Sequence, residues 1–285
     1  MKANTSMEDI KTLRAQTGVG LTKCKEALEA SEGDLEKAVL YLRKLGLASA
    51  GKKESRETKE GLIGAWADGK GFSLIEVNVE TDFVASNDVF KGFVKNLVGA
   101  LHAFASDDLE KFLALPYPED PSVTVDQQRA VVMQTVGENI RINKIAFRSS
   151  GKNGKESCGI YSHGNGKNVA VVVIEGCDKC DALAKDIAMH VVASSPDYIC
   201  KEDIPSEIIE REKEVIISQI QGKPQSVVDK IVEGKLSSFY KEVCLLEQPF
   251  VKDPDKTVGQ LLEEQGKANG VSLTLTYFSN WKIGA

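Results

Sequence analysis

The sequence has 285 residues, of which 42% are hydrophobic and 27% are charged, and its formal net charge is −6 at pH 7. These values are typical of globular proteins with a buried core. A chain of this length usually forms one large domain or two to three smaller modules. The acidic balance argues against direct nucleic-acid binding, which normally requires a basic surface. No apolar run is long enough to predict a transmembrane helix, so we expect no membrane association.

The cysteines are scattered through the chain. They are Cys24, Cys158, Cys177, Cys180, Cys200 and Cys244. In a large chain without a secretory signal, this distribution predicts reduced thiols rather than a disulfide framework. The polar stretch 1–6 is followed at once by helix signals, which argues against a signal or transit peptide. We therefore expect a cytoplasmic protein.

Residues 1–50 are predicted to form a bundle of three short helices. Thr5 or Ser6 can cap the first helix, the glycines of 18–20 end it, and Asp34 can cap the third helix. The apolar residues form narrow stripes, and the pattern resembles the ubiquitin-associated (UBA-like) type of module. A bundle this small buries little surface.

A charged linker, residues 51–60, contains no apolar residue and is predicted to be a solvated tether or an exposed helix. The next module spans 61–146. Residues 62–67 and 72–79 alternate like strands around an Asp-Gly turn, which predicts a hairpin. A loop, two helical runs and a strand at 140–149 complete the module.

Residues 147–285 are predicted to form a related module, because the order of hairpin, short loop and helix recurs. Gly69-Lys70 and Gly166-Lys167 occupy matching turns. The stretch 205–240 interrupts the repeat with two apolar stripes, which predict an inserted antiparallel helical hairpin. A helix near 258–264 and a strand at 271–278 follow. The expected class is therefore α+β: a three-helix bundle, two related α+β subdomains with antiparallel sheets and helices, and a helical insertion.

Two short motifs carry possible chemistry. Residues 64–70 have the spacing of a phosphate-binding loop, but Gly71 replaces the magnesium-binding hydroxyl and the context is strand-turn-strand. The Cys-x-x-Cys of Cys177 and Cys180 has two readings. It is a redox or metal site, or Asp178 caps a helix beside incidental thiols.

The histidines are His102, His163 and His190. The first and last lie in helical patterns and are expected to be partly buried, whereas His163 lies in a turn. No catalytic arrangement of side chains can be assembled from the sequence. We therefore expect no catalytic residues, no metal site, no cofactor and no covalent chemistry.

The stretch Thr81-Asp82-Phe83-Val84-Ala85 places a large aromatic residue after an acid in the connection that follows a strand. Such an aromatic is often buried under its own loop. The alternative is an exposed Phe83 that inserts into a pocket of a partner.

Several motifs together resemble the elongation factor Ts family. They lie in family order over about residues 8–278. The matching stretches are 13–28, continued by 33–34, 38 and 42–43, then 76–78 with 81–85, 137–140, 188–193, and 248–250 with 256–262. Two departures are present. Thr22 stands where many members have an apolar residue, and the chain ends at Ala285, whereas longer bacterial members carry a further C-terminal helical module.

The resemblance implies a guanine-nucleotide exchange factor that acts on the GTPase elongation factor Tu and is not an enzyme in the hydrolytic or redox sense. Thr81, Asp82, Phe83 and Val84 would enter the GTPase domain near the magnesium of the bound nucleotide. Phe83 would wedge between two of its helices and Asp82 would help to displace the ion.

Further contacts are implied for the bundle and the second subdomain. Arg14, Val19 and Leu21 would dock beside the nucleotide site, and His163 would approach the phosphate side. The helical hairpin would form an arm. Two other classes stay open at this point: a redox or metal protein built on the Cys-x-x-Cys, and a ubiquitin-binding-like adaptor that uses only the bundle.

Overall fold

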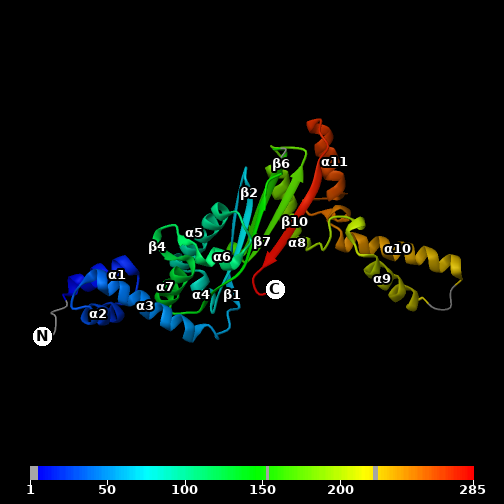
Figure 1. Cartoon of the computed structure of the whole chain (residues 1–285). Helices are drawn as coiled ribbons and strands as arrows, with labels where there is room; N and C mark the ends of the chain where they lie inside the picture. The colour runs from blue at the N-terminus through cyan, green and yellow to red at the C-terminus, as the bar shows by residue number, and fades with distance from the viewer. Residues whose placement is uncertain (1–5, 152–153, 221–223) are drawn as a thin grey trace. The chain divides into compact units, whose positions relative to one another are not determined.

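The computed structural model describes residues 6–151, 154–220 and 224–285 (Figure 1). The chain divides into two compact units. The first unit comprises the chain up to Trp66, Phe72–Ser149 and Lys282–Ala285, and the second comprises Ala67–Gly71 and Ser150–Trp281. Among the described residues, no helix combines the length and the apolar character needed to cross a membrane.

The first unit begins with the expected three helices, α1 (Met7–Thr17), α2 (Leu21–Ala30) and α3 (Leu35–Lys53). Ser6 caps α1 by accepting a hydrogen bond from the amide of Asp9 at 3.0 Å, while Thr5, the alternative cap, lies outside the described residues. The side chains that form the core of this bundle are Ile10, Leu13, Val19, Cys24, Ala27, Leu28, Ala38 and Leu42.

A three-stranded sheet with the order β1-β2-β5 and a short ribbon of β3 and β4 follow the bundle. The elements are β1 (Glu60–Asp68), β2 (Gly71–Val79), α4 (Asp82–Ala85), α5 (Asp88–Phe104), α6 (Leu109–Ala114), β3 (Pro116–Tyr117), β4 (Asp120–Thr124), α7 (Val125–Val136) and β5 (Ile140–Ser149). The residues Phe90, Phe93, Val94, Leu97 and Leu101 form an apolar stripe of α5 that is buried together with Ile75, Val77 and Val79 of β2. All residues of β2 are buried, so both faces of this strand are covered, although alternation predicted one principal buried face.

The bundle is fixed to the rest of the first unit through α3, which packs on α7. Arg43 pairs with Asp120, and the Nζ atom of Lys53 donates to the carbonyl of Gly137 at 2.6 Å. Because α3 continues to Lys53 and β1 begins at Glu60, the segment between these two elements is residues 54–59.

The second unit repeats this order around a sheet with the order β10-β7-β6. The elements outside the helical arm are β6 (Glu156–His163), η1 (Gly164–Gly166), β7 (Asn168–Glu175), α8 (Asp181–Ser194), η2 (Lys201–Asp203), η3 (Leu245–Glu247), β8 (Pro249–Phe250), β9 (Asp253–Thr257), α11 (Val258–Asn269) and β10 (Thr274–Lys282). β6 and β7 pair antiparallel from Glu156 opposite Glu175 to His163 opposite Asn168. α8 packs closely on β6, because a Cβ atom at Gly159 would lie 2.1 Å from the amide nitrogen of Lys185.

The duplication is clearer in the structure than in the sequence. Both α7 and α11 follow a two-stranded ribbon and begin with a capping box, made by Thr124 with Gln127 and by Thr257 with Gln260. The caps are 133 positions apart, and so are the left-handed glycines that end the helices, Gly137 and Gly270. The hairpin turns at 69–70 and 166–167 are only 97 positions apart. The difference of 36 residues equals the length of the predicted insertion, 205–240.

This insertion is the helical arm, made of α9 (Ser206–Ser218) and α10 (Gln225–Val243). The arm has its own small apolar cluster, formed by Ile216, Ile220 and Leu236 with partly buried neighbours. At its base the amides of Asp197 and Tyr198 both donate to the carbonyl of Val243, at 2.9 and 3.0 Å. Residues 221–223, between the two helices, lie outside the described residues.

Candidate functional site

The connection between β2 and α5 contains the residues singled out in the sequence, 81–85. Thr81 is the N-cap of α4, a single helical turn, and its Oγ1 atom accepts a hydrogen bond from the amide of Val84 at 3.3 Å. The amide of Ala85 donates to the Thr81 carbonyl at 3.1 Å, and the amide of Asn87 donates to the Val84 carbonyl at 3.0 Å. Asn87 then caps α5 through the amide of Val89 at 2.8 Å. The loop is therefore regular backbone with a cap at each end.

A second segment, at the start of β5, fixes the loop from outside. Glu138 accepts hydrogen bonds from the Thr81 amide at 3.0 Å and from the Thr81 hydroxyl at 2.6 Å. The adjacent amide of Asn139 donates to the Glu80 carboxylate at 2.6 Å. These charge-assisted bonds hold both ends of the connection between β2 and α4. The stretch 137–140 belonged to the resemblance, but its role as the support of this loop was missed.

Phe83 is 84% exposed, the highest exposed fraction among the large hydrophobic side chains described. Val84 packs against the core of the first unit and Ala85 is buried within it. In a single helical turn the inward positions are thus taken, and Phe83 is left pointing to solvent. Of the two readings of this residue, burial under its own loop is wrong. An exposed Phe forgoes the roughly 2 kcal/mol that burial of such a side chain would contribute.

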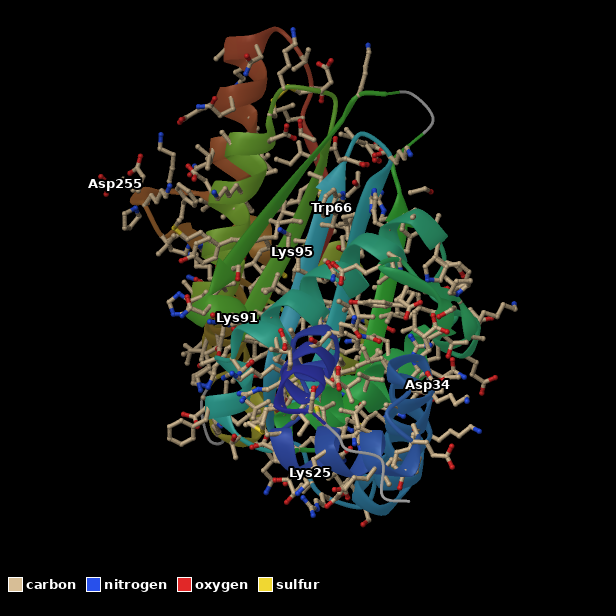
Figure 2. All side chains as sticks on the ribbon, turned by 90° about the vertical axis from the view of Figure 1, so that its left-hand side faces the viewer. Lys25, Asp34, Trp66, Lys91, Lys95 and Asp255 are labelled. Carbon is tan, nitrogen blue, oxygen red and sulfur yellow. A yellow bond between two sulfur atoms is a disulfide. The ribbon has the colours of Figure 1, made fainter. Side chains whose placement is uncertain are left out.

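The surface beside Phe83 combines apolar and charged groups. Asp82 is exposed, and within the described part of the chain its carboxylate has no hydrogen-bond or ion-pair partner. Val89, in the first turn of α5, is 47% exposed. Lys91 and Lys95 are exposed on the same helix, one turn apart (Figure 2). This connection and the helix that follows it therefore expose an aromatic group, a carboxylate and two ammonium groups.

The three candidate residues of the bundle differ in their accessibility. Arg14 is exposed on α1, and Leu21, the first residue of α2, is 41% exposed. Val19 is only 1% exposed and belongs to the bundle core. Its side chain cannot contact a partner in this conformation, so the prediction for Val19 as a surface residue is wrong. The turn at 18–20 directs Val19 inward between the helices.

The three histidines occupy different environments. His163 is exposed at the end of β6, with its Nδ1 atom 3.4 Å from the hydroxyl of Tyr161. His102 is buried, and its Nδ1 atom lies 2.9 Å from the hydroxyl of Ser73. His190 is buried in α8. The expected distinction between one exposed and two largely buried histidines is confirmed.

His190 has a defined tautomer. Its Nδ1 atom accepts a hydrogen bond from the Val251 amide at 3.2 Å, so its Nε2 atom carries the proton and donates to Gln248 at 2.9 Å. Burial lowers the pKa of this imidazole, against a smaller opposing effect of the bond to Gln248. His190 is thus a neutral structural residue.

Two sequence readings of the cysteines need correction. Cys177 and Cys180 form a disulfide, so the expectation that all thiols are reduced is wrong for this pair. The N-cap of α8 is Cys180, so the reading in which Asp178 caps the helix is also wrong. Over the described residues, no group of three or more His, Cys, Asp or Glu side chains could hold a metal ion.

The sequence that mimics a phosphate-binding loop lies on β1 and its turn. A Cβ atom at Gly64 would come within 3.0 Å of side-chain atoms of Ile75 and Val94. Gly64 therefore permits close packing of α5 on the sheet, and the segment leads into a strand rather than a helix.

Known proteins that are similar to this chain point to one family. The family model described as Elongation factor TS matches residues 80–285. A protein of Chlamydia pneumoniae named Elongation factor Ts is 58% identical over 280 residues, covering 98% of this chain and 99% of its own length. Proteins of the same name from Chlamydia trachomatis serovar L2b and Chlamydia felis are 56% and 55% identical, over 98% and 99% of this chain and 99% and 100% of their own lengths.

The fold and the site together define a duplicated α+β protein that exposes an aromatic side chain on a capped loop. The family match makes that class specific. The chain belongs to the elongation factor Ts family, a family of translation elongation factors.

Proposed function

We propose that this protein is a guanine-nucleotide exchange factor that binds the GDP form of elongation factor Tu and promotes release of GDP. The observation that carries the proposal is Phe83, which is 84% exposed on a loop whose backbone is fixed by caps and by Glu138. A rigid, exposed aromatic group loses little conformational entropy when it enters a pocket. It is therefore suited to be an anchor residue.

In this proposal the loop acts on the magnesium and phosphate site of the GTPase. Magnesium and the phosphate-binding loop supply much of the affinity for GDP. Insertion of Phe83 between two helices of the GTPase domain would displace the elements that hold the ion. The unpaired carboxylate of Asp82 would help to displace magnesium, while Thr81 and Val84 would hold these two side chains in place. No covalent step and no cofactor are involved.

Other surfaces would supply further contacts. On the bundle, Arg14 and Leu21 are exposed and would dock beside the nucleotide site. On the second unit, the exposed His163 at the end of β6 would face the phosphate side. The proposal requires neither a nucleic acid nor a membrane, and it places the activity in the cytoplasm with the translation machinery.

The test is release of a fluorescent GDP analogue from elongation factor Tu. We expect strong acceleration by the wild-type protein and at least about a tenfold loss in Phe83→Ala, the size of effect typical of an anchor residue. The free energy of unfolding should change by no more than about 0.5 kcal/mol, as for substitutions at other exposed sites. Val271→Ala, which truncates another exposed apolar residue, is the matched control and should retain full activity.

Two outcomes would overturn the proposal. A folded wild-type protein that does not accelerate release from its cognate GTPase excludes the exchange activity. Full activity of a folded Phe83→Ala protein excludes the wedge mechanism, because the side chain would then make no contribution to exchange.

A further inference from the structure

The disulfide between Cys177 and Cys180 lies in the connection between β7 and α8. In the repeat, this connection is the counterpart of the one that leads from β2 to α5 and carries Phe83. At this position the second unit thus has a short loop closed by a disulfide, whereas the first unit has the loop that exposes Phe83. Nothing in the exchange mechanism uses this disulfide, so its chemistry requires a separate explanation.

The two sulfur-bearing residues are not equivalent. Cys180 is 7% exposed, whereas Cys177 is half-buried and lies nearer to solvent. The Sγ atom of Cys177 also accepts a hydrogen bond from the amide of Lys179 at 3.3 Å. An attacking thiol therefore reaches the sulfur of Cys177 first.

Cys180 is placed to act as the leaving group. It is the N-cap of α8, a helix of 14 residues, and so lies at the positive end of the helix dipole. This position stabilises a thiolate, and a more stable thiolate leaves faster in thiol–disulfide exchange.

The turn does not depend on the disulfide for its conformation. The hydroxyl of Ser157, on β6, donates to the Cys177 carbonyl at 2.9 Å and accepts from the Cys180 amide at 2.7 Å. Ser157 therefore bridges the same two residues through noncovalent bonds. We expect this turn to keep its shape after the disulfide is reduced.

The disulfide is also poorly suited to stabilise the fold. It closes a ring between positions only three apart in sequence. Because the stabilisation by a cross-link grows with the length of the loop that it closes, such a ring constrains the unfolded chain very little. A bond that is accessible, has a good leaving group and is not needed for the turn has the properties of a reactive disulfide rather than a structural one.

We propose that Cys177 and Cys180 form a reversible dithiol–disulfide site whose reaction partners are thiols and dithiols, either small molecules or reducing proteins. A thiolate attacks the Cys177 sulfur, forms a mixed disulfide and displaces the Cys180 thiolate. A second thiolate then attacks the external sulfur of the mixed disulfide, which releases the Cys177 thiolate and one oxidised disulfide of the reductant. Both cysteine thiolates take up protons, and the two electrons come from the two thiols.

The other cysteines provide an internal contrast. Burial raises the pKa of Cys200 and of Cys244 to about 11, so both remain protonated at neutral pH. Cys24 is fully buried in the bundle core. Cys158 is half-buried on β6, directly after Ser157, whose hydroxyl bonds to both cysteines of the pair, and is the best control for nonspecific oxidation.

The first experiment equilibrates the full-length protein in two series of buffers, one with graded ratios of oxidised to reduced dithiothreitol and one with graded ratios of oxidised to reduced glutathione. Unreacted thiols are then alkylated and located by peptide mass mapping. We expect Cys177 and Cys180 to titrate together as a single two-electron couple, from either direction, while the other four cysteines stay reduced. The far-ultraviolet circular dichroism should be the same at both ends of the titration.

A second experiment, with glutathione disulfide, identifies which of the two cysteines is accessible enough to form the mixed disulfide. Cys177 in the variant Cys180→Ser should form a mixed disulfide at least about tenfold faster than Cys180 in Cys177→Ser, because exposure favours Cys177. Cys158→Ser should leave the couple unchanged.

Three results would overturn the proposal. The first is a pair that stays reduced across both series of buffers, including excess glutathione disulfide. The second is a disulfide that reacts only after the protein is unfolded, which would make it structural. The third is oxidation of Cys158 to the same extent as the pair, which would show that the oxidation is not specific to Cys177 and Cys180. None of these results bears on nucleotide exchange.

Discussion

Thr81 supports the Phe83 loop in two ways, because its hydroxyl both caps α4 and donates to Glu138. Thr81→Val keeps the shape of the side chain but removes both hydrogen bonds. We expect a loss of about 1–3 kcal/mol in the free energy of unfolding. Exchange activity should also fall although Phe83 is present, because the anchor loses its fixed position. Urea denaturation and the exchange assay measure the two effects.

Glu138→Gln is the matched control for that variant. It keeps one acceptor oxygen for Thr81 but removes the charge that strengthens both bonds. Its effects should be in the same direction and smaller. Unchanged stability and activity in Thr81→Val would show that the loop holds its conformation without this support.

His190 predicts a pH dependence of stability. Its pKa in the folded protein is lowered by burial, whereas in the unfolded chain it is near the ordinary value of about 6.5. Below about pH 6.5 the unfolded state therefore binds a proton that the folded state does not. The contribution of this residue to stability is complete above that pH and decreases as the pH falls, with a slope of at most about 1.4 kcal/mol per pH unit.

Chemical denaturation at several pH values between 7.5 and 5.5 measures this slope. The variant His190→Gln should have a shallower slope than the wild type, whatever its absolute stability. Phe83→Ala, at an exposed position without a titratable group, should keep the wild-type slope. Equal slopes in all three proteins would contradict the assignment of His190 as a buried neutral residue.

At the residue scale, sequence reasoning located the loop but not its accessibility. Composition could not decide whether Phe83 was exposed, because the decision depends on Val84 and Ala85 taking the inward positions of one turn. Val19 fails for the opposite reason, since its turn directs it into a core that only tertiary packing defines. The pairing of Cys177 with Cys180 depends on the conformation of a turn, which spacing alone does not specify.

Among the elements, the helical arm is expected to contribute least to the stability of the rest of the fold. Its apolar cluster is separate from the core cluster of the second unit. The amides of Leu245 and Leu246 donate to the carbonyls of Tyr198 and Ile199, at 2.8 and 3.0 Å, so the two ends of the insertion are already joined at the base. Replacement of residues 205–240 by a short Gly-Ser linker should therefore give a folded protein.

We expect the unfolding midpoint of that deletion variant to stay within a few degrees of the wild type. Because the arm carries none of the proposed anchor residues, the fall in exchange rate should be smaller than in Phe83→Ala. Phe250→Ala, at a buried position of the second unit, is the destabilising reference. A deletion variant that unfolds as readily as this reference would show that the arm belongs to the core.

The main helices and strands were predictable from local signals, because apolar periodicity, caps and Asp-Gly turns specify them directly. The ribbons β3–β4 and β8–β9 were missed. Each contains a strand of only two residues, which is too short for any alternation to be visible. The single turn α4 was also missed, since four residues do not show a helical period.

For the whole molecule, the proposed exchange activity carries a thermodynamic requirement. If the protein lowers the affinity of elongation factor Tu for GDP by a given factor, GDP must lower the affinity of the two proteins for each other by the same factor. Titration calorimetry with nucleotide-free and GDP-bound GTPase should give that equality. Equal affinities for the two forms, together with accelerated release, would show that the protein lowers the barrier to release without shifting the equilibrium.

The duplication was difficult to detect in the sequence because the two halves have few identical residues at matching positions. The two halves instead share structural features: a two-stranded ribbon, a threonine capping box and a left-handed glycine at the end of the helix. The capping threonines are 133 residues apart, and so are the glycines. The two hairpin turns, which are not separated by the insertion, are only 97 residues apart. A search for a repeat with one fixed period therefore detects either the hairpins or the later helices, but not both.

The joined base of the arm also bears on how the chain folds. β7 and β10 are neighbours in one sheet, yet about 100 residues separate Glu175 from Thr274. Loop-closure entropy grows only with the logarithm of loop length, so shortening this connection to about 60 residues would save only about 0.5 kcal/mol. That is less than one typical hydrogen bond contributes. The folding rate should therefore depend only weakly on the length of the segment inserted here. We expect that a reporter domain can be inserted in this connection without slowing the pairing of β7 with β10.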